Sequence, residues 1–320
     1  MATDPFHEGE KAMQSSIGMR EPIAAIGSRV IRDHMPEQHI ELFERLPTLF
    51  VGTLDGEGQP WATVVVGPPG FVQSPEDRSL RVAARPSSDD PASAGLRPGA
   101  SVGLLGIEPH TRRRNRANGL VVASDESGFT VHIHQSFGNC PKYIQGRRPA
   151  PRPGRRPEAA EREGARLGDD ARALVERSDT MFIASSSAAR LDAHDLSTVG
   201  GAGVDVSHRG GKPGFVAIER SDTGDRLIVP DYAGNAMFNT LGNLLLWPRA
   251  GLLFLDFVEG HALQLATTAE IRAEDPALDR FPGAERLLVL TVQGGWLRRA
   301  AVPLAWESTE PPARARARAP

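Results

Sequence analysis

Residues 46–72 read LPTLFVGTLDGEGQPWATVVVGPPGFV. Two runs rich in β-branched and aromatic residues flank Asp55-Gly56-Glu57-Gly58, a composition typical of a tight turn, so the stretch predicts a β-hairpin. Further strand-like runs follow at short intervals, at residues 79–84, 100–107, 120–124 and 129–134. Five or six strands with short connections favour a small barrel over a sheet with helical crossovers.

A second stretch repeats these features in the same order. Phe50-Val51-Gly52-Thr53 matches Phe182-Ile183-Ala184-Ser185, and Pro-Gly-Phe-Val occurs at both 69–72 and 213–216. Three later matches pair 80–82 with 227–229, 102–105 with 252–255, and 119–121 with 269–271. Unrelated β-rich segments share short apolar runs, but rarely five in one order. Because the spacing changes only at turns, where insertions are tolerated, the pattern indicates a duplicated β unit.

The chain is therefore predicted to be mainly β with flanking helices, built as two small barrels in tandem. Residues 147–168 are rich in Pro, Gly, Arg and Glu and cannot offset ordering entropy by burial, which is typical of a linker. The predicted parts are a helical N-terminal segment (1–45), a first copy (46–146), the linker (147–168), a second copy (169–306) and a disordered tail (307–320).

Composition excludes several classes of function. The 320 residues are 40% hydrophobic and 24% charged with a net charge of −3, which predicts a soluble globular protein and no nucleic-acid or membrane partner. Without a secretory leader or a long apolar stretch, we expect a cytoplasmic protein. The single Cys140 excludes a disulfide framework, and His132 and His134 lack a third ligand, so no metal site is expected. High Arg, Ala and Gly content is typical of a bacterial, GC-rich genome.

The second copy carries a polar strand that suits an anionic ligand. Ser207-His208-Arg209-Gly210-Gly211-Lys212 presents a hydroxyl, an imidazole and two cations around a glycine pair. The alternative is a solvated basic turn. The first copy has Val64 and Val65 opposite His208 and Arg209, so it lacks these groups.

Two further segments offer polar groups. In residues 230–244, Asn239 and Asn243 lie four apart on one face of an expected short helix that also carries Thr240, unless they only tie the turn. Residues 108–116 are expected to form a hairpin loop with four arginines, of which Arg113, Arg114 and Arg116 are candidates for binding an anion; a solvated loop is the alternative.

These motifs resemble one family. Phe-x-Ala-Ser at 182–185, the basic strand, Asn-x-x-Gly-Asn-Leu at 239–244, Pro-Arg-Ala-Gly-Leu-Leu-Phe at 248–254 and Val-Pro-Leu-Ala-Trp at 302–306 resemble the FMN-binding split barrels typified by pyridoxamine 5'-phosphate oxidase. The resemblance covers about residues 179–306 well and 46–145 less well. The oxidase's Arg-x-x-x-Leu-Lys arrangement is absent, so pyridoxamine phosphate is not the expected substrate.

The resemblance implies tandem split β-barrels with FMN in a groove between barrels, within a homodimer or an intrachain pseudo-dimer. It implies phosphate contacts from Arg209 and Lys212 and ring or ribityl contacts from Ser207 and His208. Further contacts are implied from the helix residues Asn239, Thr240 and Asn243 and from Gln264. The expected function is an FMN-dependent oxidoreductase that uses a small-molecule substrate or electron donor, with no catalytic side chain assigned. The alternative is a non-catalytic module that binds flavin, deazaflavin or haem.

Overall fold

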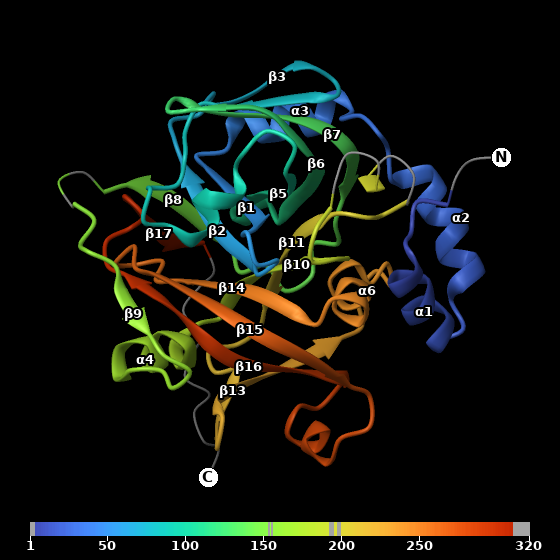
Figure 1. Cartoon of the computed structure of the whole chain (residues 1–320), viewed down its shortest axis with the longest axis vertical. Helices are drawn as coiled ribbons and strands as arrows, with labels where there is room; N and C mark the ends of the chain where they lie inside the picture. Colours follow the sequence, from blue (N-terminus) through green and yellow to red (C-terminus); the bar gives the residue numbers. More distant parts are fainter. Residues whose placement is uncertain (1–3, 153, 155, 192–194, 197–199, 310–320) are drawn as a thin grey trace, which may run out of the picture.

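The computed structural model describes residues 4–152, 154, 156–191, 195, 196 and 200–309, and Figure 1 shows two β-rich halves beside an N-terminal group of helices. The helices are α1 (Glu8–Ser16), α2 (Arg20–Val30) and α3 (Glu37–Arg45) near the N-terminus, and α4 (Asp169–Arg177) and α6 (Asn239–Leu246) in the second half. The prediction of a mainly β chain with flanking helices is confirmed. No helix of the described residues is long and apolar enough to cross a membrane.

The first half is one antiparallel sheet with the order β2-β1-β5-β6-β7-β4-β3. Its strands are β1 (Thr48–Leu54), β2 (Pro60–Val66), β3 (Val72–Glu76), β4 (Ser79–Val82), β5 (Ser101–Glu108), β6 (Arg113–Asp125) and β7 (Gly128–Gly138). The β1–β2 hairpin forms as predicted, because Asp55 Oδ1 accepts hydrogen bonds from the backbone N–H groups of Glu57 and Gln59, at 2.9 Å each, and Gly58 adopts a φ of 75°.

The second half repeats that order as β11-β10-β14-β15-β16-β13-β12. Its strands are β10 (Thr180–Ser186), β11 (Val204–Gly210), β12 (Ala217–Ser221), β13 (Gly224–Tyr232), β14 (Arg249–Leu255), β15 (Ala262–Arg272) and β16 (Ala284–Arg298). Within the described residues, both sheets remain open rather than closing into a barrel. Short 3-10 helices lie at Pro91–Gly95, Pro109–Thr111 and Pro276–Arg280.

The strand registers show which positions of the two halves correspond. Phe50 lies opposite Val64, and Phe182 lies opposite His208, so Val64 and His208 correspond as the sequence predicted. On the other side of the same strands, Phe50 lies opposite Leu105 and Phe182 opposite Leu253. The predicted match of 102–105 with 252–255 was therefore wrong by two residues.

The error extends to the next strand. Leu105 pairs with Arg116 and Leu253 pairs with Gln264, so Arg116 corresponds to Gln264, and the predicted match of 119–121 with 269–271 was also displaced by two. Because side chains alternate between the faces of a strand, a shift of two leaves the apolar pattern unchanged. The sequence pattern therefore could not detect it.

The two halves share an apolar interface. Phe50 and Phe182 stack across it with ring centroids 3.6 Å apart and planes 14° from parallel. Both rings belong to a buried cluster drawn from both sheets, which also includes Ile107, Ile144 and Trp306. Burial of each such side chain contributes on the order of 1.5–3 kcal/mol, so the halves are expected to unfold together.

The segment predicted as a linker, residues 147–168, contains two short strands. β8 (Arg147–Pro151) pairs with β17 (Leu304–Ser308), and β9 (Glu161–Glu163) pairs with the edge of β16. Hydrogen bonds between backbones order this segment, although it has few apolar side chains to bury. Its amino-acid composition gave no sign of this pairing. Of the predicted disordered tail, residues 307 and 308 lie in β17, whereas residues 310–320 lie outside the described residues.

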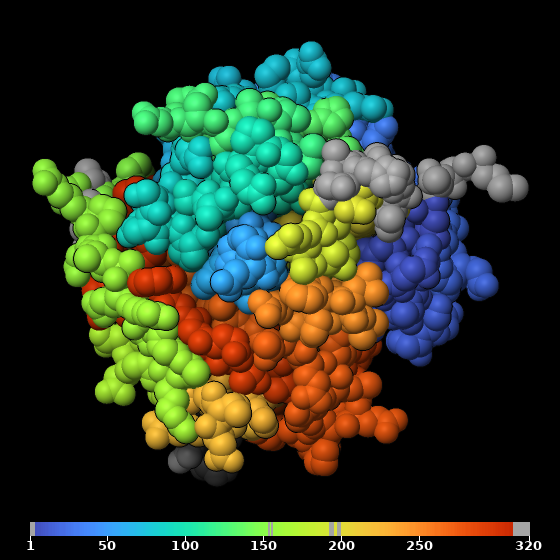
Figure 2. Space-filling view, viewed as in Figure 1, coloured from blue at the N-terminus to red at the C-terminus, as the bar shows by residue number. Residues whose placement is uncertain are grey.

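Helix α1 packs against α6 of the second half, and Figure 2 shows the blue N-terminal atoms beside the orange surface of the second half. A Cβ added at Gly9 would lie 2.1 Å from the carbonyl oxygen of Gly242, and one added at Gly242 would lie 2.6 Å from the backbone nitrogen of Glu10. The two helices therefore touch through glycine backbone, which brings His7 and Glu10 into the protein interior, where each is at most 2% exposed.

Candidate ligand site between the two halves

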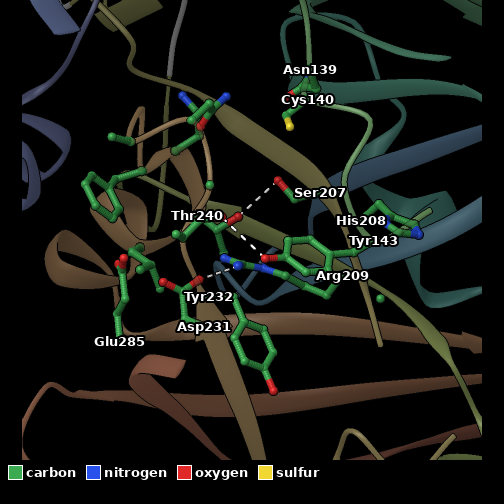
Figure 3. A pocket seen from close by; sticks show the side chains of 18 of the residues that line it. Asn139, Cys140, Tyr143, Ser207, His208, Arg209, Asp231, Tyr232, Thr240 and Glu285 are labelled. Carbon is green, nitrogen blue, oxygen red and sulfur yellow. Dashed lines mark hydrogen bonds and ion pairs between the residues drawn. The ribbon is translucent and has the colours of Figure 1, made fainter. Parts of the chain in front are cut away.

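A cavity of about 330 Å³ lies between the halves, at the lower end of the range of about 300–1,000 Å³ that is usual for small-molecule sites. The second half supplies β11, the end of β13, residues 233–238 and the start of α6, and the first half supplies β6 and the residues after β7. Figure 3 shows Ser207 directed toward Thr240 and Arg209 directed toward Asp231, with Asn139 and Cys140 approaching from the first half. Ile17 and Met19, in the α1–α2 connection, complete the lining.

Three of the four arginines of the 108–116 segment, Arg113, Arg114 and Arg116, lie on a strand and not in the loop that the sequence predicted. Only Pro109–Thr111 forms a turn, closed by Arg112 at a φ of 56°, and β6 begins at Arg113. Side chains two apart on a strand share a face, so Arg114 and Arg116 both reach β11 while Arg113 points away. Arg113 donates to the backbone oxygen of Gln38 at 3.0 Å.

The three arginines of the cavity differ in their counter-charges. Arg116 Nε lies 3.2 Å from Asp205 Oδ1, and Arg209 forms an ion pair with Asp231. Arg114 donates from Nη1 to His208 Nδ1 at 3.0 Å and to the His208 carbonyl at 3.4 Å, and it has no carboxylate partner among the described residues. Burial, together with repulsion from Arg116 and Arg209, lowers the pKa of Arg114 to about 10. One partly buried cation of this cavity therefore has no carboxylate partner among the described residues.

His208 is held as a neutral imidazole. Because a guanidinium only donates hydrogen bonds, the contact from Arg114 requires an unprotonated Nδ1, and the remaining proton is on Nε2. Burial, reinforced by the charges of Arg114, Arg147 and Arg209, holds the pKa of His208 well below its usual value. The ring also packs edge-on against Phe182, with centroids 5.6 Å apart. His208 can thus supply a polar group without adding a charge.

A buried network fixes the floor of the cavity. Arg116 Nη1 donates to Asn239 Oδ1 at 2.7 Å, and Asn239 Nδ2 donates to Glu10 Oε1 at 2.5 Å. Burial and the nearby Asp205 carboxylate raise the pKa of Glu10 well above its usual value. His7 Nε2 lies 2.9 Å from Asn243 Oδ1. The N-terminal helix α1 therefore positions the residues at the start of α6.

The start of α6 faces the cavity without a capping side chain. Its N-cap, Phe238, has a φ of 62° and provides no side-chain hydrogen bond, while Asn239, Thr240 and Leu241 line the cavity. Ala236, at a φ of 56°, also adopts the left-handed conformation that is costly for residues other than glycine. Such conformations concentrate at ligand sites, because surrounding structure must maintain them.

Aromatic side chains line the cavity, from the buried Phe215 to the exposed Tyr143 at its mouth. Phe215, Phe238, Tyr143 and Tyr232 all line it. Tyr143 comes from the first half and Tyr232 from the second, and their rings stack with centroids 5.8 Å apart. The cavity thus combines a cationic floor with an aromatic mouth.

Most of the predicted site residues meet in this cavity. The structure brings together Ser207, His208, Arg209, Asn239, Thr240, Arg114 and Arg116. Lys212 is exposed in the turn after β11, outside the cavity. Asn243 is fully buried and bonded to Ser185 and Asp205.

Gln264 lies outside this cavity, at the position of β15 that corresponds to Arg116 of β6. Its Nε2 donates to the carbonyl of Ala62 at 3.0 Å, just as the corresponding Arg116 approaches the carbonyl of the corresponding Val206 at 3.4 Å. Gln264 also donates to Asp90 at 2.9 Å, and Asp90 accepts from Arg298 at 2.8 Å. Around Gln264, the protein's own side chains thus satisfy one another.

Sequence reasoning missed several lining residues. Asn139, Cys140 and Tyr143 follow β7, and Asp231 and Tyr232 end β13. No ligand contact was predicted for these residues from the sequence. Their placement beside the polar strand β11 depends on how the two halves pack, which no local pattern encodes.

Comparison with known proteins found weak likenesses only. No family model and no curated protein matches the chain. Among solved structures, HupZ from Group A Streptococcus is 13% identical, covering 39% of this chain and 89% of its own, with a TM-score of 0.27. A candidate pyridoxamine 5'-phosphate oxidase from Lactobacillus delbrueckii is 15% identical, covering 42% and 98%, with a TM-score of 0.29. HutZ, described as the haem storage protein of Vibrio cholerae, is 14% identical, covering 42% and 95%, with a TM-score of 0.26. At such scores the likenesses decide neither fold nor function.

Proposed function

We propose that the cavity binds FMN and that the protein is a flavin-dependent oxidoreductase. The observation that carries the proposal is Arg114, a largely buried guanidinium with no carboxylate partner among the described residues. A buried charge is costly unless it is paired, so the site favours a ligand that brings an anion. A phosphate group meets this need, because a guanidinium binds phosphate oxygens through charge-assisted hydrogen bonds.

The start of α6 supports the same assignment. The N-terminus of a helix favours negative charge through its backbone N–H groups and its dipole, and the N-cap residue of this helix, Phe238, provides no side-chain hydrogen bond. Thr240 Oγ1 donates to Ser207 Oγ at 3.0 Å, which leaves the hydroxyl proton of Ser207 as a further donor. A guanidinium, the backbone N–H groups of a helix and a hydroxyl, from three elements, therefore all line this cavity.

The aromatic mouth suits the flat, largely apolar ring system of a flavin. Tyr232 and Phe238 would bind the ring, Tyr143 would close it in from the first half, and the neutral His208 would offer a hydrogen bond without opposing charge. Bound FMN would supply the electron-transfer chemistry, and the protein would supply binding, orientation and exclusion of water. Arg209 remains occupied by Asp231 and positions that carboxylate instead of meeting the phosphate.

We further propose that the chain is a tandem pair of split barrels arisen by duplication, which pair within one chain. The identical strand order and the corresponding registers support this proposal. The cavity has walls from both halves, so an intrachain pseudo-dimer builds the site without a second copy. The open sheets are consistent with a split barrel.

The test compares FMN with riboflavin, which lacks the phosphate. Fluorescence titration should show that Arg114→Met weakens FMN binding by about 10- to 100-fold, the value of one charge-assisted contact, while riboflavin binding changes little. Arg113→Met is the matched control, because Arg113 lies on the same strand but points away. Equal losses for both ligands, or no FMN binding by the native protein, would refute the assignment.

A haem-binding module is the second candidate. Cys140, Tyr143 and Tyr232 line the cavity, and thiolate and phenolate side chains are known axial ligands of haem iron. The arginines would meet the haem carboxylates. A Soret band after haem addition, with no binding of FMN, would decide for this reading.

A further inference from the structure

Three buried titratable side chains lie beneath the ligand cavity, and the proposed binding of FMN assigns no role to them. His7, Glu10 and Asp205 are each at most 5% exposed. His7 is the N-cap of α1, Glu10 lies in the first turn of that helix, and Asp205 lies on β11. A buried carboxylate is costly unless a cation or a proton neutralises it, so the partners of each group decide its charge.

His7 is neutral, and Asp205 has a cation of its own. His7 Nδ1 accepts from the backbone N–H of Gly9 at 3.1 Å, so the ring proton is on Nε2, which donates to Asn243 Oδ1 at 2.9 Å. Burial lowers the pKa of His7 below its usual value. His7 therefore does not act as a cation toward Glu10, although its Nε2 lies 3.5 Å from Glu10 Oε2. Asp205 Oδ1 lies 3.2 Å from Arg116 Nε.

Glu10 has no ion-pair partner with a fixed positive charge among the described residues. Its Oε1 accepts from Asn239 Nδ2 at 2.5 Å, and its Oε2 accepts from the backbone N–H of His7 at 2.9 Å. Burial and the Asp205 carboxylate hold the pKa of Glu10 well above its usual value, and the more distant Arg116 opposes this only weakly. The other charged side chains near α1 pair with one another, Lys11 with Glu8 and Arg20 with Asp4. Glu10 is therefore the member of this cluster whose charge changes most readily.

The charge of Glu10 sets the net charge that the cavity offers to a ligand. The carboxylates of Asp205 and Asp231 face the three arginines that line the cavity, which are Arg114, Arg116 and Arg209. Beside them, Arg286 and Glu285 pair with each other at 2.8 Å. With Glu10 protonated, one positive charge is therefore left for an anion. An ionised Glu10 would cancel that charge.

We propose that Glu10 regulates the ligand cavity as a positioning residue, so that the cavity binds its anionic ligand together with a proton on Glu10. The regulation rests on the proposed function, because it acts on the same site. Asn239 connects the two, since it lines the cavity, accepts from Arg116 at 2.7 Å and donates to Glu10. Loss of the proton places a carboxylate one amide away from Arg116, and an anionic ligand is then held less tightly.

Affinity measured across pH tests the proposal, with FMN and inorganic phosphate as the probes. Glu10→Gln keeps the shape and an acceptor oxygen of the side chain but cannot ionise. Between about pH 5 and about pH 9, the native protein should lose about 10- to 100-fold in affinity relative to this variant, the effect of one charge at short range. The comparison removes the titration of the ligand itself. Glu8→Gln is the matched control, because Glu8 lies on the same helix but is exposed, and it should titrate like the native protein.

Calorimetry in two buffers of different ionisation enthalpy gives a second readout, which a purely structural role would not change. Where the affinity of the native protein falls most steeply, binding should take up as much as about one proton per ligand, and Glu10→Gln should take up none. No uptake by the native protein, or the same pH dependence in both proteins, would overturn the proposal.

The two probes separate this proposal from the proposed function. FMN binding without proton uptake on Glu10 would leave the proposed function intact and refute the regulation. Phosphate binding with that uptake, in a protein that does not bind FMN, would refute FMN as the ligand and support the proton link.

Discussion

Arg114→Met and Arg116→Met remove the same charge from the same strand face, yet they should change stability in different ways. In the ligand-free protein, Arg114 has no carboxylate partner among the described residues and is repelled by two other arginines. A pKa of about 10 in place of 12.5 corresponds to on the order of 3 kcal/mol of unfavourable environment for its charged form. Removing it also leaves His208 Nδ1 without its donor, which costs about 1–3 kcal/mol.

The two contributions of Arg114 nearly cancel, so Arg114→Met should leave the free energy of unfolding within about 1 kcal/mol of the native value, or raise it. Arg116→Met should lower it by about 3–5 kcal/mol, because Asp205, whose side chain is 7% exposed, would remain buried without its counter-charge. Urea unfolding of the ligand-free proteins at pH 7 measures both. Equal destabilisation by the two variants would show that Arg114 has its own counter-charge in the protein and would remove the argument for an anionic ligand.

Three other perturbations test separate features. Gly242→Ala should lower the free energy of unfolding by about 1–3 kcal/mol, because its Cβ would lie 2.6 Å from the backbone nitrogen of Glu10. The variant should also increase hydrogen exchange of the backbone amides in α1. Unchanged protection of these amides would contradict the packing of α1 against α6. The pKa of Glu10 is raised in the fold, so the unfolded chain loses that proton first and stability falls as pH rises from about 4.5 toward the folded pKa. Glu10→Gln should reduce this fall of the free energy of unfolding with pH, as measured by urea unfolding at several pH values. An unchanged pH dependence would refute the raised pKa of Glu10. Calorimetric titration should give one FMN per chain, since Gln264, Asp90 and Arg298 bond to one another in the region that corresponds to the ligand cavity, and two equal sites would refute that reading.

Much of the strand plan could be predicted from the sequence because its causes are local. The turn at residues 55–58 and the alternation of apolar residues specify the β1–β2 hairpin, and the repeated Pro-Gly-Phe-Val at 69–72 and 213–216 correctly related Val64 to His208. The two-residue error in matching β5 with β14 arose because the correct match depends on pairing between distant strands. Displacement by an even number preserves which face is apolar, so only the hydrogen-bonded register reveals it.

The site was predictable where one segment carried several polar groups, as in Ser207-His208-Arg209. It was not predictable where partners come from distant segments. Glu10 bonds to Asn239 across more than two hundred residues, through two helices that meet at glycine backbone. Arg114 was predicted in a hairpin loop, yet the pairing of β6 with β5 and the contact of Arg114 with β11 place it on a strand.

The two corresponding regions of the halves differ in how their cations are paired. In the region around Gln264, this neutral side chain takes the position of Arg116, and the cation is Arg298, which lies within 3.0 Å of both Asp89 and Asp90. One cation there faces two carboxylates, and Val64 replaces His208 on the corresponding strand. In the ligand cavity, Arg116 pairs with Asp205 and Arg209 pairs with Asp231, whereas Arg114 has no carboxylate partner among the described residues. Corresponding strands thus hold a fully paired cation in one region and, in the other, the guanidinium that the proposed anionic ligand would neutralise.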